Sequence, residues 1–403
     1  MDLELFQNTS TGSLVPISGN GPDGMSWTHS AFVPHPLGES DPELSGRAYR
    51  SVAAARAALG ALDATARQLP NPRLFRHQSL RVEAQATAAL EGTYEPLAKV
   101  LSAAAAETLS PSMREVLNFV TVANIAFGAV EEGRPLSVPL LSELQSDLMA
   151  GTNAEGPYSG QVRPIQVVVG QRPDAAPGLS PVERARYIPS PPGIDLEARL
   201  RDLLRWIDTD HGPELDPVVA AGMAHYQFES LHPFHDGNGR LGRLLIVVHL
   251  YRAGLLSEPS LTVSPWFEAR RTAYYDALFG VSAQADWSTW IGLFADGIAA
   301  SAAQTRDRML ALTEAMRVAK EQIHVGGIRT TNALRLIDVA VDRLVFTTAE
   351  AAAALGMKPQ GAAKLIDSLQ SLGILSAVDD RKYNRIYYAP RVADVVLSSQ
   401  AAG

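Results

Sequence analysis

The sequence predicts a mainly α-helical protein with one small β-hairpin and a C-terminal winged helix-turn-helix domain. Ala- and Leu-rich stretches with helical spacing fill residues 48–150 and return after residue 193. One β-branched stretch bounded by glycines, GQVRPIQVVVG (160–170), interrupts them. From residue 330 on, the pattern is helix, tight turn, helix and two-stranded ribbon, the order of a winged helix.

These patterns divide the 403 residues into five parts. The first part is rich in Gly, Pro and Ser and is expected to form an irregular arm. The others are expected to be an N-terminal helical region, a helical core, a linker helix and the winged helix. Their ranges are 1–47, 48–135, 136–300, 301–329 and 330–403.

Within the helical parts, local signals mark where elements begin and end. The helix 76–93 is expected to close at Gly92, because glycine readily adopts the left-handed backbone of a C-cap. The stretches 160–170 and 185–193 suggest a hairpin with a long, Pro-rich loop. The apolar run 244–256 is expected to be a buried helix, because it is too short to span a bilayer.

The tail carries the signals of a compact domain. A tight turn is expected at Gly356, a helix from about Pro359, and a ribbon that turns at Asp379-Asp380. Residues 326–403 contain nine Lys and Arg and seven Asp and Glu, and this excess of positive charge is small for a DNA-binding domain. The wing 381–385 is more basic, so DNA contact and protein docking both stay open.

Composition narrows the class of protein. Hydrophobic residues make up 46% and charged residues 19%, an ordinary globular balance, and the net charge is -8. That charge does not favour a protein that binds nucleic acid or membranes through its overall field. The chain has no cysteine, which excludes disulfides, thiolate catalysis and Cys-ligated zinc and fits a cytoplasmic location. The acidic, polar start MDLELFQNTSTGS does not resemble a secretory signal.

The stretch HPFHDGNGRLGR (232–243) concentrates polar and flexible residues just before an apolar helix. Glycines let consecutive backbone N–H groups turn toward one point, and the following helix adds its free N–H groups and positive dipole end. Arg240 and Arg243 lie three apart, so both can sit on one side of the first turn. The pattern predicts a site for a polyphosphate.

Two further side chains suggest chemistry at that site. Asp236 would hold Mg²⁺ through oxygen, and His232 would accept a proton from an incoming hydroxyl. A structural turn is one alternative. A transition-metal cluster with His235 is another, although the neighbouring arginines would repel a cation. Together the residues favour transfer from a nucleotide to an alcohol.

This stretch resembles the Fic family signature, His-Pro-Phe-x-Asp/Glu-Gly-Asn-Gly-Arg-x-x-Arg, at every specified position. AHYQFESL upstream resembles the family helix that leads into it, and the wider resemblance runs from about residue 28 to 300. The resemblance implies a Fic-type helical bundle, with residues 136–300 as the catalytic core and the 160–190 hairpin as the family's flap.

The resemblance also implies roles for single residues. His232 is the general base, Asp236 binds Mg²⁺, and Phe234 anchors the loop in the core. The implied reaction transfers AMP from ATP to a Ser, Thr or Tyr hydroxyl of a protein and releases pyrophosphate. The residues implied to bind ATP in the loop are Gly237, Asn238, Gly239, Arg240, Gly242 and Arg243. Doc-type phosphotransferases carry Lys at the position of Gly239, so glycine there favours adenylylation.

Residues 87–92, TAALEG, resemble the Fic inhibitory motif Ser/Thr-x-x-x-Glu-Gly/Asn. From the residues alone, Glu91 is an ordinary solvated carboxylate before the C-cap glycine Gly92. The resemblance instead implies that Glu91, one turn after Thr87, pairs with Arg243 in the place of the γ-phosphate and blocks the productive pose of ATP. In some relatives the same Glu also removes AMP from the target.

The remaining expectations are weaker in chemical detail. The flap edge would pair with an extended target segment, or the hairpin is only structural. Arg163 and Gln166 match the flap pattern without a clear role, and Tyr274 would stack on adenine or simply pack a helix.

The sequence therefore favours an autoinhibited protein adenylyltransferase that uses ATP and Mg²⁺. Its target is a protein hydroxyl, which can be its own, and a homodimer is compatible with the resemblance. A nucleotide-sensing DNA-binding regulator, a Doc-like phosphotransferase and a bifunctional enzyme that also removes AMP stay as alternatives. The target protein stays open.

Overall fold

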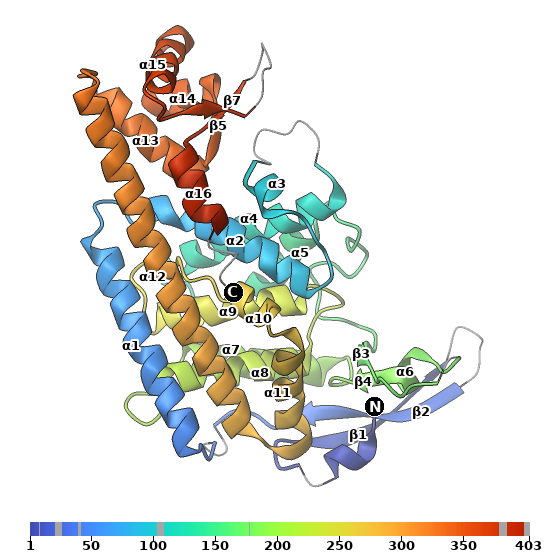
Figure 1. Ribbon diagram of the computed structural model, residues 1–403. Helices are drawn as coiled ribbons and strands as arrows, with labels where there is room; N and C mark the ends of the chain where they lie inside the picture. Colours follow the sequence, from blue (N-terminus) through green and yellow to red (C-terminus); the bar gives the residue numbers. More distant parts are fainter. Residues whose placement is uncertain are drawn as a thin grey trace. The chain divides into compact units, whose positions relative to one another are not determined.

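The computed structural model describes residues 1–7, 9–20, 26–38, 42–102, 109–176, 178–378 and 385–398. In this part of the chain, helices dominate and the strands form three small antiparallel sheets (Figure 1). The expected mainly α-helical fold with a small hairpin and a C-terminal winged helix is confirmed.

The chain folds as two compact units, each assembled from three segments. The first unit contains Met1–Ala57, Thr121–Leu255 and Arg270–Ala299, and the second contains Ala58–Val120, Leu256–Ala269 and Ala300–Gly403. Three helices continue from one unit into the other: α1 (Gly46–Gln68), α4 (Pro111–Glu131) and α12 (Trp287–Val325). The expected boundary at residue 300 therefore falls inside one long helix.

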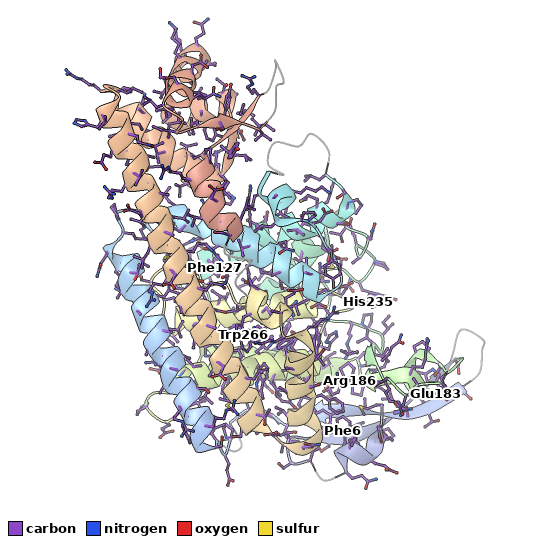
Figure 2. All side chains as sticks on the ribbon, in the orientation of Figure 1. Phe6, Phe127, Glu183, Arg186, His235 and Trp266 are labelled. Atoms are coloured by element: carbon purple, nitrogen blue, oxygen red, sulfur yellow. The ribbon has the colours of Figure 1, made fainter. Side chains whose placement is uncertain are left out.

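The first unit begins with a hairpin where an irregular arm was expected. After the short 3-10 helix η1 (Leu3–Phe6), strands β1 (Gly12–Asn20) and β2 (Ser26–Pro34) pair antiparallel. The expectation was wrong because Pro, Ser and Gly within the strands hide their alternation. Phe6, labelled in Figure 2, packs its ring 5.4 Å from that of Phe32, so the hairpin has an aromatic cluster of its own.

Two helices form the centre of the first unit. Helices α8 (Pro217–Leu231) and α9 (Asn238–Arg252) pack against each other and are buried on almost all sides. The Asp216 side chain caps α8 by accepting from the N–H of Val218 at 2.8 Å. The flanking helices of this unit are α5 (Val138–Met149), α7 (Ile194–Asp208) and α11 (Arg271–Gln284).

The flap hairpin is present but shorter than its sequence pattern suggested. Strands β3 (Val169–Gln171) and β4 (Ala185–Tyr187) pair antiparallel, with the short helix α6 (Pro181–Arg184) in the loop between them. Residues 160–168 form no strand because their carbonyl and N–H groups bind side chains and other loops, as described below.

In the second unit, helix α2 (Arg73–Leu90) packs on α10 (Ser264–Glu268) and on α13 (Thr331–Arg343). The Glu83 carboxylate on α2 is buried and accepts hydrogen bonds from the backbone N–H and the hydroxyl of Ser264. Burial lowers the pKa of Arg308 to about 10, and the charge of Glu83 opposes that shift. The buried Glu83 carboxylate therefore ties α2 to α10 through Ser264. The short helix α3 (Leu97–Ser102) follows α2.

The winged helix-turn-helix is also part of the second unit. Helix α14 (Thr348–Leu355) ends at Gly356 with φ 64°, and α15 (Pro359–Ser371) follows, as expected. Strands β5 (Val345–Thr347), β6 (Ser376–Ala377) and β7 (Ile386–Tyr388) form a sheet in the order β5-β7-β6, before the last helix α16 (Pro390–Ser398). The expected turn at Asp379-Asp380 and most of the basic wing lie outside the described residues.

Among the described residues, one helix is long and apolar enough to cross a membrane by composition alone. It is α4, and 50% of its most apolar window is buried inside the protein. Buried core helices pass the same test, so this is weak evidence for a membrane span. The run 244–256, which the sequence suggested as the most apolar, lies mostly in the buried helix α9.

A buried histidine makes the stability of the first unit depend on pH. His225 is 2% exposed, and its Nε2 lies 2.7 Å from the hydroxyl of Tyr274. Burial, together with the smaller effect of the nearby charge of Arg243, lowers its pKa to about 3. Between about pH 6.5 and pH 3, His225 therefore binds a proton in the unfolded chain but not in the folded protein.

We predict that His225→Gln flattens the loss of stability in acid. In the native protein, this histidine's contribution is fully present above pH 6.5 and falls by roughly 1.4 kcal/mol per pH unit toward pH 3. Denaturant unfolding between pH 7 and 4.5 should show a slope smaller by about one proton in the variant. His324→Gln, which removes an exposed imidazole, controls for the substitution, and equal slopes for native protein and His225→Gln would contradict the assignment.

We predict that Glu83→Ala lowers the free energy of unfolding by about 1–3 kcal/mol, because it leaves the buried N–H and hydroxyl of Ser264 without their acceptor. Thermal and denaturant unfolding measure the effect. Glu314→Ala on α12 is the control, since Glu314 pairs with Arg317 at the exposed surface. A Glu83→Ala protein as stable as the control would refute the stabilising role of the bonds between Glu83 and Ser264.

Candidate active site

His232 lies where helix α8 ends, in a backbone conformation that non-glycine residues rarely adopt. Its φ and ψ are 49° and 60°, in the left-handed region. Its N–H donates to the carbonyl of Phe228 at 3.0 Å, and its Nδ1 lies 3.3 Å from the carbonyl of Glu229. When Nδ1–H donates to that carbonyl, Nε2 carries the lone pair. The imidazole is only partly buried, so it is suited to act as a base.

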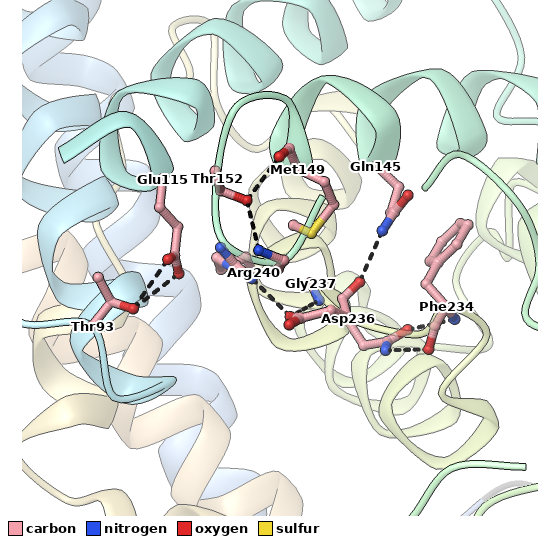
Figure 3. Close-up of polar contacts among 11 residues, drawn as sticks. Thr93, Glu115, Gln145, Met149, Thr152, Phe234, Asp236, Gly237 and Arg240 are labelled. Carbon is pink, nitrogen blue, oxygen red and sulfur yellow. Dashed lines mark hydrogen bonds and ion pairs between the residues drawn. The ribbon is translucent and has the colours of Figure 1, made fainter. Parts of the chain in front are cut away.

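Asn238 braces the loop that follows His232. Its Oδ1 accepts from the N–H of Phe234 at 2.9 Å, and its Nδ2 donates to the Phe234 carbonyl at 2.9 Å (Figure 3). The Phe234 ring is fully buried, as expected of a loop anchor. The Asn238 side chain is thus engaged within the loop, and its backbone N–H is the group it can offer to a phosphate.

Gly237 opens helix α9 with a left-handed φ of 81°. It brings no side-chain cap, so the first N–H groups of α9, at Asn238, Gly239 and Arg240, have no side-chain acceptor from the N-cap. A Cβ at Gly237 would lie 2.9 Å from Cε of Met149. Glycine is therefore favoured here by backbone conformation, and the helix end keeps its anion-binding character.

Asp236 sits at the exposed edge of this loop and is held by two neighbours. Its Oδ1 accepts from Nη2 of Arg240 at 2.8 Å, and its backbone carbonyl accepts from Nε2 of Gln145 at 3.1 Å (Figure 3). Arg240 is 2% exposed, whereas the side chain of Asp236 is 47% exposed. His235, labelled in Figure 2, is exposed as well. The loop thus presents a carboxylate to solvent beside a buried cation.

Arg243 lies one turn further along α9 and is completely buried. A hydrogen bond from Arg243 opposes the rise in pKa that burial causes at the Tyr274 hydroxyl. A Cβ at Gly242 would lie 2.3 Å from Oε1 of Glu229, so only glycine lets that carboxylate approach α9. Glu229 is therefore a neighbour of α9 that the sequence did not identify, and Tyr274 lies beside Arg243.

Tyr274 has a different place from the one considered for it. Its ring is 0% exposed and lies between His225 and Trp290, with centroids 5.9 and 6.0 Å away. A ring enclosed in this way has no face available for adenine. The observed contacts instead make Tyr274 a core residue that supports Arg243.

The residues of the inhibitory motif lie in the second unit, at the end of α2. The N–H groups of Gly92 and Thr93 donate to the carbonyls of Ala89 and Ala88 at 3.0 and 2.9 Å, the pattern of a Schellman cap. Gly92 has the φ of 94° that this cap requires, and Glu91 is exposed next to it. Thr87 is buried. The expected helix end at Gly92 is confirmed.

The loop fits a magnesium ion that arrives with a nucleotide. Mg²⁺ is commonly held by one or two carboxylates together with substrate phosphates and waters. Asp236 supplies one exposed carboxylate next to the start of α9. Within the described residues, no group of three or more His, Cys, Asp or Glu is arranged to hold a metal.

Two residues from outside the motif bind its backbone. Gln145 on α5 connects the carbonyl of Asp236 with the N–H of Gly160. Arg163 binds the carbonyls around His232. Gln166, the other residue of the flap pattern, donates to the carbonyl of Pro189 at 2.9 Å. The partners of Gln145, Arg163 and Gln166 are backbone atoms. Every residue has such atoms, so the sequence gives no sign of these contacts.

Two family models match the chain. Residues 135–250 match the model described as Fic/DOC family, and residues 49–128 match the model described as Fic/DOC family N-terminal. The first segment contains His232 and the entire loop, and the second contains Thr87, Glu91 and Gly92.

Curated relatives match over a short segment. The chain is 46% identical to a protein of Drosophila melanogaster named Protein adenylyltransferase Fic over 68 residues. These 68 residues are 17% of this chain and 14% of that protein. It is 33% identical over 102 residues to Protein adenylyltransferase fic-1 of Caenorhabditis elegans, 25% of this chain and 17% of that protein. The chain thus matches only a small part of the length of these relatives.

A solved structure supports the fold. A Fic family protein from Desulfovibrio desulfuricans aligns with a TM-score of 0.52 at 20% identity, over 87% of this chain and 98% of that chain. Residues 135–250 thus match the Fic/DOC family and residues 49–128 match its N-terminal region, and the two segments together span just under half of the chain.

Proposed function

We propose that this protein is an autoinhibited adenylyltransferase that moves AMP from ATP to a hydroxyl group of a protein and releases pyrophosphate. The observation that carries the proposal is the juxtaposition of two groups in one short loop. A partly exposed imidazole at His232 is followed, five residues later, by the uncapped N-terminus of α9. A base beside an anion-binding helix end is what transfer of a phosphate-linked group to an alcohol needs.

His232 would act as the general base. With Nδ1–H donated to the carbonyl of Glu229, Nε2 accepts the proton of the attacking hydroxyl. The new bond forms between the hydroxyl oxygen and the α-phosphorus of ATP. The bond from that phosphorus to the pyrophosphate oxygen breaks, and pyrophosphate leaves with the electron pair.

The phosphates would bind where α9 begins. The N–H groups of Asn238, Gly239 and Arg240 and the helix dipole attract oxyanions, and the buried guanidinium of Arg243 adds a full charge. Asp236 would hold Mg²⁺, which neutralises charge on the phosphates when bound. Asp236 would then exchange its bond with Arg240 for the metal, leaving Arg240 to the nucleotide.

AMP is the proposed group for two reasons. Gly239 stands where Doc-type phosphotransferases carry Lys, and the curated relatives are named protein adenylyltransferases. A Doc-like phosphotransferase, which would transfer the terminal phosphate instead, is the alternative that the label position tests.

Glu91 would restrain the reaction. It is the exposed last residue before the C-cap glycine of α2, one turn after the buried Thr87. A carboxylate that competes with the γ-phosphate for Arg243 keeps ATP from its productive pose. The proposal leaves removal of AMP by the same residue as an additional activity. A protein hydroxyl of the chain itself is a possible first target, and action in the cytoplasm and as a homodimer is compatible with it.

A second candidate function rests on the C-terminal domain. The winged helix is complete in its helices and three-strand order, and this fold commonly binds DNA. The exposed polar residues Gln360 and Lys364 of α15 are few for DNA readout. A nucleotide-sensing regulator would bind DNA specifically without transferring AMP.

We predict that Glu91→Gly raises automodification at least about tenfold and that Glu91→Gly combined with His232→Ala abolishes it. The first change removes the competing carboxylate, and the second removes the base, which is commonly worth 10²–10⁴ in rate. Incorporation from α-labelled ATP with Mg²⁺ measures transfer, and mass spectrometry of the product identifies the added group.

Three results would count against this assignment. Label entering from γ-labelled ATP alone would identify a phosphotransferase. An unchanged rate in Glu91→Gly would refute the inhibitory role of Glu91. A sequence-specific DNA complex without any transfer of AMP would favour the regulator. His235→Ala is the matched control for His232→Ala, because His235 is the exposed histidine of the same loop.

A further inference from the structure

Arg163 is a buried arginine whose partners are all backbone carbonyls. It is 1% exposed and lies between the loop after α8 and the base of the flap hairpin. Its Nε donates to the carbonyl of His232 at 2.7 Å, and its Nη2 reaches the carbonyl of Leu231 at 3.3 Å. Its own backbone N–H donates to the carbonyl of Pro233 at 2.9 Å. One residue thus holds three consecutive carbonyls centred on His232.

The other side of the guanidinium faces the flap. Nη1 donates to the carbonyl of Ile165 at 3.1 Å, and Nη2 donates to the carbonyl of Ser190. Ile165 precedes β3 and Ser190 follows β4, so these bonds hold both ends of the hairpin. The hydroxyl of Tyr187 on β4 donates to the carbonyl of Ser230 at 3.1 Å, next to those that Arg163 binds.

These bonds act where α8 needs them. The last carbonyls of a helix lack intrahelical donors, and a cation at a helix C-terminus is favoured by the dipole. The left-handed backbone at His232 is costly for a residue with a Cβ and persists only where its surroundings enforce it. Burial lowers the pKa of Arg163 to about 10, which leaves it charged at neutral pH.

We propose that Arg163 is the positioning residue of His232: its planar fork holds the left-handed turn that aims the imidazole and fixes the flap at the same place. The inference deepens the proposed adenylyl transfer and rests on it. The base and the strand edge that would receive the target segment are held by one side chain. A displacement of the turn would therefore misalign the acceptor hydroxyl and the base together.

Two substitutions test this in the Glu91→Gly background. Arg163→Lys keeps a cation but replaces five donors fixed in a plane by a single ammonium, and Arg163→Gln keeps a planar amide without the charge. Both should lower kcat for AMP transfer by about a hundredfold, the usual effect of a 1 Å misplacement. KM for ATP should change less than about threefold, because Arg163 does not contact α9.

Arg186→Lys is the matched control. Arg186 lies on β4 of the same hairpin but pairs with the exposed carboxylate of Asp276. We expect its kcat and KM to equal those of the Glu91→Gly parent. A fall in kcat as large as that of Arg163→Lys would show that any change in the hairpin slows transfer, and would overturn the specific role of Arg163.

A second measurement does not depend on transfer. In spectra of protein with ¹⁵N-labelled histidine, the parent should show His232 mainly as the Nδ1–H tautomer, and both Arg163 variants should show a mixture. If the parent transfers no AMP, the proposed function fails, yet the tautomer still decides whether Arg163 orients His232. An unchanged tautomer with unchanged kcat would overturn the inference, and so would a tautomer change confined to a variant that has lost its thermal unfolding transition.

Discussion

The left-handed turn at His232 is the constraint on which the candidate site depends. It ends α8 and lets the chain reverse into a loop only five residues long before α9 begins. Without this reversal, the imidazole and the N-terminus of α9 could not belong to the same few residues. Arg163 donates hydrogen bonds to the backbone carbonyls of the turn, and the side chains of Asn238 and Gln145 bind the backbone of the loop after it. Many of the polar side chains around the motif thus hold its backbone in place.

Buried positive charge is the second property that gives the site its character. Arg240 and Arg243 are almost completely enclosed in the first unit, where an unpaired cation is costly. Asp236 offsets one of them from the exposed edge of the loop, and Tyr274, held by His225, supports the other from the core. A site that already contains desolvated cations attracts anions strongly, because their charge is not screened by water.

The sequence predicted the elements whose signals are local. Gly237, the C-cap at Gly92 and the turn at Gly356 were found because positive φ favours glycine. The N-terminal hairpin was missed because Pro16 and Gly19 interrupt its alternation. The two alternatives for Tyr274, stacking on adenine or packing a helix, stayed open because a tyrosine pair looks the same in sequence whether buried or exposed. Arg163 and Gln145 could not be assigned a role, since their acceptors are carbonyls brought together by tertiary structure. The candidate residues of the motif were thus predictable, whereas their supports were not.

The central claim is that the start of α9 binds the phosphates of ATP while His232 faces the reacting phosphorus. A crystal structure of the Glu91→Gly protein with Mg²⁺ and a non-transferable ATP analogue tests it most directly. The account predicts phosphate oxygens within hydrogen-bond distance of the N–H groups of Gly239 and Arg240, with Nε2 of His232 directed at the α-phosphate. A nucleotide bound elsewhere, or a His232 ring turned into the interior, would contradict it.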